Sequence, residues 1–143
     1  MNPLDEQGNI TWLVFRRPEV DPDQVTEIPG LQPSETLRVG EIYPWYGGER
    51  VSDVGSWKLR LKPRHYYDRI EDQLEDWIQL LQPKADALRR LHDFGYGGYI
   101  DGKAASRSLS VCIEPAVLTA LGELGLALDI WLYEQSPGDR KRA

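Results

Sequence analysis

Cysteine and histidine are scarce in this chain, and their scarcity limits the chemistry that it can perform. Cys112 is the single cysteine, so no internal disulfide and no thiolate metal cage can form. His65 and His92 are the two histidines, and neither stands in an H-x-H or H-x-x-x-H spacing. No G-x-S-x-G elbow is present, although a triad can also assemble across a fold. We therefore expect a non-enzymatic protein without metal or cofactor.

Long apolar runs and an excess of basic residues are also missing. No stretch approaches the roughly 20 apolar residues of a membrane span, and the acidic start MNPLDEQGN is not a secretory signal. Together with the single cysteine, this predicts a cytoplasmic protein without a membrane partner. Lys and Arg number 17 against 23 Asp and Glu, giving a net charge of −6. This balance argues against nucleic acid as a partner and is compatible with a basic protein.

The strongest local pattern is a helical apolar stripe between Asp68 and Leu81. Its apolar members follow helical spacing and are Ile70, Leu74, Trp77, Ile78 and Leu81. Asp68 is the expected N-cap, with Glu71 three positions later. Pro83 suits the first turn of a second helix, and Gly95 suits its end. That second helix is expected to bury Ala87, Leu88, Leu91 and Phe94.

Alternating apolar residues predict strands on both sides of this helix pair. Expected strands cover residues 9–17, 34–41, 57–61, 96–101, 109–114 and 126–133, with the small polar turn 102–107 between the fourth and fifth. Cys112 falls in the fifth strand as an expected core cysteine. Expected helices cover residues 21–28 and a segment from Pro115 to near Gly125. Residues 43–55 are expected to form a loop with an irregular strand.

This order of elements predicts an α+β fold. We expect a two-layer sandwich in which helices pack on one face of a mainly antiparallel sheet. The best topology is a ferredoxin-like core with a C-terminal βαβ extension. Residues 9–134 form the single expected domain, between a flexible N-terminus (1–8) and a disordered tail (135–143).

Several segments together resemble one bacterial family. They are DPDQVTE (21–27), GLQPSETLRVGE (30–41), GSWKL (55–59), LEDWIQLLQPKADAL (74–88) and IEPAVLTALGELGLALDIWLY (113–133). In order and spacing they are similar to the bacterial domain of unknown function 4279. Pro29 and the aromatic segment 43–46 depart from that pattern. The resemblance implies a small soluble bacterial protein with an α+β fold, and it implies no catalytic residue.

Two features are candidate partner-binding sites. The first is a set of carboxylates opposite the apolar stripe, of which Asp68, Asp72, Glu75 and Asp76 are the predicted contacts. Like-charged pairs four residues apart repel by roughly 0.2–0.5 kcal/mol each, so a basic group should offset them. Lys58, Arg60 and Lys62 are the internal candidates, and a basic partner is the external one. A merely solvated helix face is the other alternative.

The second candidate is the aromatic segment containing Tyr43, Trp45 and Tyr46. Tyr and Trp on a loop are effective interface anchors because they offer a large area with few torsions. The same aromatics could instead fold over the sheet. We expect a protein-interaction domain, such as an immunity or inhibitor protein that neutralises a basic toxin or effector. The alternative is a small-ligand-binding or sensory domain whose pocket is lined by Trp12, Trp45 and Tyr46.

Overall fold

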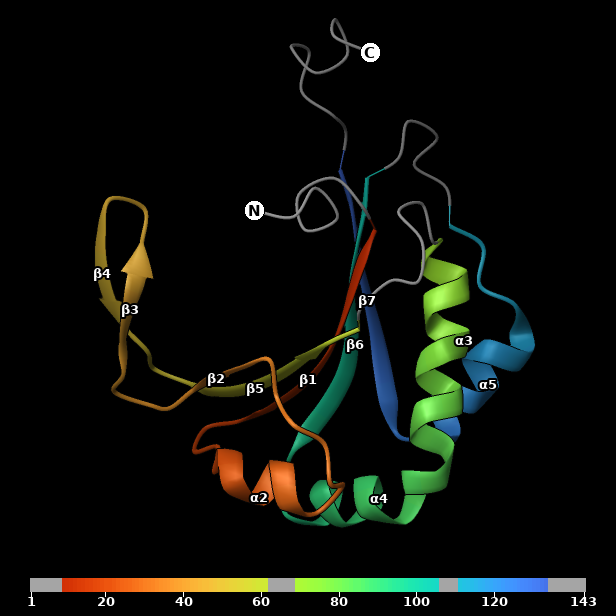
Figure 1. The fold of residues 1–143 in the computed structure, drawn as a ribbon, viewed down its shortest axis with the longest axis horizontal. Coiled ribbons are helices and arrows are strands. Elements are labelled where there is room, and N and C mark those ends of the chain that lie inside the picture. The colour runs from red at the N-terminus through yellow and green to blue at the C-terminus, as the bar shows by residue number, and fades with distance from the viewer. Residues whose placement is uncertain (1–8, 62–68, 106–110, 134–143) are drawn as a thin grey trace, which may run out of the picture.

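The computed structural model describes residues 9–61, 69–105 and 111–133 (Figure 1). The predicted flexible N-terminus and disordered tail lie outside these residues. The elements in chain order are β1 (Ile10–Arg17), α2 (Pro22–Glu27), β2 (Glu35–Leu37), β3 (Ile42–Trp45), β4 (Gly48–Val51), β5 (Gly55–Arg60), α3 (Ile70–Leu81), the 3-10 turn η1 (Gln82–Lys84), α4 (Ala85–Asp93), β6 (Gly97–Ala105), α5 (Pro115–Glu123) and β7 (Leu126–Tyr133).

Five of the strands form one sheet in the order β2-β5-β1-β6-β7, and β3 and β4 form a separate hairpin. β6 and β7 are parallel, whereas the other neighbours in the large sheet are antiparallel. The connections β1–α2–β2 and β5–α3–α4–β6 are therefore two interleaved split βαβ units, which is the ferredoxin-like arrangement. α5 and β7 extend it beyond β6. The predicted α+β class is confirmed.

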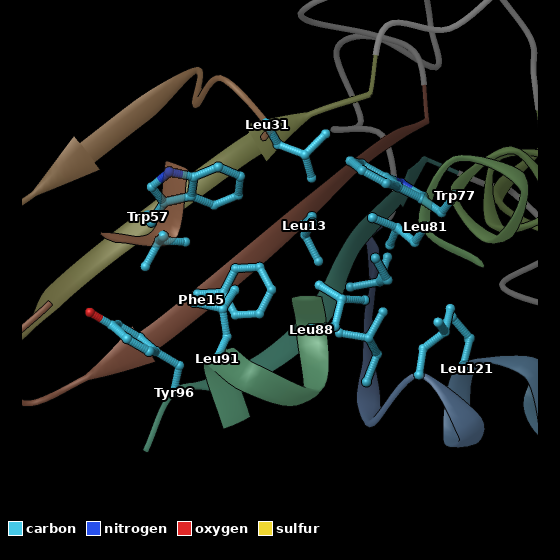
Figure 2. Close-up of a cluster of buried hydrophobic side chains, with 14 of the residues drawn as sticks. Leu13, Phe15, Leu31, Trp57, Trp77, Leu81, Leu88, Leu91, Tyr96 and Leu121 are labelled. Atoms are coloured by element: carbon cyan, nitrogen blue, oxygen red, sulfur yellow. The ribbon is translucent and has the colours of Figure 1, made fainter. Parts of the chain in front are cut away.

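Helices α2, α3, α4 and α5 pack on one face of the large sheet, which we call the covered face (Figure 1). Figure 2 shows how side chains from strands and helices converge there. Apart from Ile78, which is only partly buried, the predicted stripe of α3 is buried. Leu88 and Leu91 of α4 are buried as predicted, but Phe94 is exposed because it lies beyond the last helical turn. Gly95 takes the left-handed conformation (φ 89°) that ends this helix.

A polar chain is buried where α3 crosses the start of β1. The indole Nε1 of Trp77 donates to the Thr11 hydroxyl at 2.9 Å. That hydroxyl donates to Oε1 of Gln73 at 2.7 Å, and Gln73 Nε2 donates to the Asn9 carbonyl at 2.9 Å. Thr11, Gln73 and Trp77 are fully buried. Buried polar groups are costly unless they are bonded, so this chain fixes how α3 sits on β1.

Some predicted boundaries are wrong. α3 begins at Ile70 with Arg69 at the N-cap position, so the predicted cap at Asp68 is one residue early. β6 continues to Ala105 through part of the predicted turn at 102–107, because residues 97–103 pair with β1 and 98–105 with β7. Residues 111–114 are not in a strand, and Cys112 is exposed rather than in the core. The rest of that expected strand, 109–110, lies outside the described residues.

Candidate functional site

The segment 43–55, predicted as a loop with an irregular strand, contains most of a regular hairpin that begins at Ile42. β3 and β4 pair antiparallel from Ile42 with Val51 to Trp45 with Gly48. Tyr46 and Gly47 form the turn, and both have positive φ, at 21° and 79°. Positive φ at both central residues is the mark of a type I′ turn, which matches the twist of hairpin strands. Gly47 was the signal for this turn in the sequence. Pro44 obscured the hairpin, because a proline within a run argues against a strand.

The hairpin projects from the body of the molecule (Figure 1). Three aromatic side chains are in contact on β3 and its turn. Trp45 lies edge-on to Tyr43 and Tyr46, with ring centroids 6.0 and 4.9 Å apart. The guanidinium of Arg50 lies 5.2 Å from the Trp45 ring centroid. These contacts hold the indole in place without covering it. We call residues 42–51 the aromatic hairpin.

Exposure on the aromatic hairpin is high for such large side chains. Tyr46 is 92% exposed and Trp45 is 46% exposed. Ile42 and Val51, which are cross-strand partners, are also exposed. An isolated two-stranded hairpin is at best marginally stable in water. Folding alone therefore gives little reason to gather these apolar groups here, so the hypothesis that they fold over the sheet is not supported.

The acidic face of α3 consists of Glu71, Asp72, Glu75 and Asp76; the other predicted contact, Asp68, lies outside the described residues. Arg69 holds its first turn: Nε donates to Asp72 Oδ2 at 3.4 Å and Nη1 lies 3.8 Å from Glu71 Oε2. The hydrogen bond to Asp72, with the nearby negative charges, raises the pKa of Arg69. An arginine at the N-cap of the same helix thus offsets part of the repulsion.

The described basic residues that were predicted to pair with these carboxylates, Lys58 and Arg60, lie on β5 and not beside α3. Lys58 and Arg60 pair across from Val14 and Trp12 on the sheet face that carries no helix, and Lys62 lies outside the described residues. The structure also keeps the two predicted sites apart, since the aromatic hairpin and α3 lie at opposite ends of the molecule (Figure 1). One compact partner contact cannot contain both sets of residues.

The helix-free face of the large sheet, which we call the open face, holds a site that the sequence did not point to. Trp12, Asp101 and Asp129 stand side by side on β1, β6 and β7. Oδ1 of Asp101 is covered and has no hydrogen-bond partner among the described residues. Its desolvation and the charge of Asp129 raise the pKa of Asp101, against the effect of Lys58 and Lys103. Only the register between β6 and β7 brings the two carboxylates together.

Two of the cavities lined by described residues lie on the helical side, and both are small. One, of about 180 Å³, is lined by α4, the start of β6 and the turn between α5 and β7, with Arg89, His92 and Glu123 as its polar groups. The other, of about 150 Å³, lies between the acidic face of α3 and the segment from Cys112 to Val117. Trp12, Trp45 and Tyr46 line neither cavity. Both volumes are below the roughly 300 Å³ at which small-molecule pockets begin.

Metal binding needs grouped ligands, and a membrane span needs a long apolar helix. Across 9–61, 69–105 and 111–133, no three His, Cys, Asp or Glu side chains are grouped to hold a metal ion. His92 is exposed near the end of α4, and His65 is outside the described residues. In that part of the chain, no helix has both the length and the apolar character to cross a membrane.

Comparison with known proteins gives one family and no individual relative. Neither the curated proteins nor the solved structures contain a significant match to this chain. The family model of a domain of unknown function, DUF4279, matches residues 7–135, which include every helix and strand described above. The chain therefore belongs to the DUF4279 family.

Proposed function

We propose that this protein is a non-enzymatic interaction domain that binds a protein partner through the aromatic hairpin. The observation that carries this proposal is the exposure of Trp45 and Tyr46 on a projecting hairpin. Trp, Tyr and Arg are the residues that most often dominate binding energy at protein interfaces. Here the hairpin offers all three, and the ring contacts orient the indole before any partner arrives.

The acidic face of α3 has a second role in this proposal. Because it lies far from the hairpin, it does not anchor the same contact, but its charge can attract a basic partner over a distance. A bacterial immunity or inhibitor protein that neutralises a basic toxin or effector is the specific function we propose. The net charge of −6 supports a basic partner. The alternative of a small ligand among Trp12, Trp45 and Tyr46 gains no support from the two cavities described above, which those residues do not line.

The experiment is a quantitative pull-down with three immobilised proteins. They are the wild type, the hairpin variant Trp45→Ser with Tyr46→Ser, and the control Phe94→Ser. Phe94 is 48% exposed and Trp45 46%, so the control removes a comparable exposed aromatic at a distant place. We expect one partner to be retained by the wild type and the control, and its recovery from the hairpin variant to fall at least about tenfold, equivalent to 1.4 kcal/mol.

A charge variant separates anchoring from attraction. Glu75→Lys should slow association with that partner at low salt and have little effect at high salt, because screening removes long-range attraction. Glu123→Lys, an exposed acid on α5, is the control for net charge. Equal recovery from the wild type and the hairpin variant would reject the hairpin as the binding site. Equal effects of the two lysine substitutions would reject a specific role for the acidic face.

A further inference from the structure

The two edges of the large sheet differ in how they are protected. β2, at one edge, has three residues, whereas β7, at the other, has eight. Proteins usually protect long edges with Lys, Pro, bulges or a covering segment, because unpaired backbone groups recruit another strand. β7 reads LALDIWLY, with no Lys or Pro and with Asp129 as its only charge. Within the part of the chain that the structure describes, no strand pairs with its outer side.

Burial along β7 also falls toward its C-terminal end. Leu126 is 7% exposed, Leu128 and Ile130 are partly buried against the core, and Leu132 is 42% exposed. All four point to the covered face, as the register with β6 shows. On the open face, Trp131 is 62% exposed. The second half of β7 thus presents apolar side chains on both faces beside an unpaired backbone edge.

We propose that β7 pairs antiparallel with β7 of a second copy of this chain, with the two-fold axis at Ile130. In this register Leu128 stands opposite Leu132 of the second copy, and Ile130 stands opposite itself. On the open face Asp129 stands opposite Trp131 of the second copy. The pairing covers residues 127 to 133 of each chain and joins the two large sheets into one. Such a contact is isologous, so each copy uses the same surface.

The residues of β7 favour this register over those with the axis at Asp129 or at Leu128. Side chains directly opposite one another lie on the same face, so the axis must pass through a residue position. An axis at Asp129 would place two carboxylates directly opposite, which is unfavourable. An axis at Leu128 would pair only residues 126 to 130 and leave Trp131 and Leu132 uncovered. An axis at Ile130 avoids both penalties, which is why a second copy fits this edge.

Engineered cysteines test the register in full-length protein, with Cys112→Ser as the background. Ile130→Cys should form a disulfide-linked dimer under mild oxidation. Opposite residues in antiparallel strands have Cα atoms about 4.5–5.5 Å apart, which a disulfide can span. Asp129→Cys should not cross-link, because its copy is a diagonal neighbour at about 7–8 Å. Leu80→Cys, on the exposed side of α3, controls for random collision.

Light scattering during gel filtration, over a micromolar concentration range, tests the dimer without a cross-link. The wild type should be a dimer, and Leu132→Lys should lose it because lysine protects an edge. Leu80→Lys, at a residue 38% exposed, should remain dimeric. A monomeric wild type would overturn the proposal, even if β7 then accepted a strand of another protein. Equal cross-linking at positions 80, 129 and 130, or a dimer insensitive to Leu132→Lys, would also overturn it. None of these outcomes depends on the aromatic hairpin.

Discussion

Alternate residues of β1 show the contrast between the two faces of the large sheet. Thr11, Leu13 and Phe15 point to the covered face and are buried under helices. Trp12 and Arg16 point to the open face and keep part of their surface in solvent, with Arg60 over Trp12 and Arg16 over Tyr99. Of the β1 residues on the open face, only Val14 is fully buried, between its cross-strand partners Lys58 and Tyr99.

The polar groups of the two faces differ in the same way. On the covered face, the buried hydroxyl, amide and indole of Thr11, Gln73 and Trp77 are bonded to one another. On the open face, Oδ1 of Asp101 is covered without a partner among the described residues, and Asp129 stands beside it. A dry interior makes an unsatisfied group expensive, whereas a face reached by water tolerates one. Stability therefore resides on the covered face, and the open face carries a small electrostatic strain.

The largest expected effect comes from removing a large buried side chain from the covered face. Trp77→Ala should lower the free energy of unfolding by about 3–5 kcal/mol, because a large buried side chain is replaced by a cavity. Urea denaturation measures this loss. Trp131→Ala, on the open face, is the matched control; made in the Leu132→Lys background, where the proposed dimer does not form, it should change the free energy by no more than about 0.5 kcal/mol. Similar losses for the two tryptophans would contradict the contrast between the faces.

A smaller effect should follow from breaking the buried polar chain without changing its shape. Thr11→Val removes the acceptor of Trp77 Nε1 and the donor to Gln73 Oε1. Leaving these groups unsatisfied should cost about 1–3 kcal/mol in the same urea assay. Thr36→Val on β2, where the side chain is exposed, should change the free energy by less than about 0.5 kcal/mol. If both substitutions were neutral, the hydrogen bonds of the chain would not contribute to stability.

The smallest effect, of opposite sign, belongs to the open face. Burial and Asp129 raise the pKa of Asp101 above that of the unfolded chain, so the folded state binds more protons in the acidic window between the two values. Stability therefore falls as pH rises through that window. Asp101→Asn should remove the penalty and stabilise the protein at neutral pH by less than about 1 kcal/mol, since the site is partly solvated.

Denaturation of wild type and Asp101→Asn across acidic and neutral pH gives the comparison. The difference between them should shrink as pH falls through the acidic window. Asp129→Asn should lower the pKa of Asp101 and so recover part of the same gain. A difference that is independent of pH, or a loss of stability in Asp101→Asn at neutral pH, would show that the carboxylate is satisfied and the strain absent.

Local periodicity made much of this fold predictable. The apolar stripe of α3, the glycine stop after α4, the start of α5 at Pro115 and the alternation of β7 all appear where the sequence predicts them. Each depends on residues within one or two turns of helix, or within one strand, so no distant contact is needed to infer it. The alternation of strands and helices also made a ferredoxin-like core the best topology, since few topologies accommodate it, but the order of strands in the sheet came only from the structure.

Only the tertiary structure decided the features that depend on residues far apart in the chain, which are buried hydrogen bonds, strand register and exposure. The bond between Thr11 and Gln73 spans 62 positions, and no pattern in either segment shows that two polar residues share the core. The strand register, not the composition, brings Asp101 beside Asp129 and sends Lys58 and Arg60 away from the acidic face of α3. Likewise, Tyr43, Trp45 and Tyr46 are aromatic by sequence, but their exposure depends on a hairpin that leaves the sheet. Burial and pairing are properties of the assembled layers, and a single segment does not encode them alone.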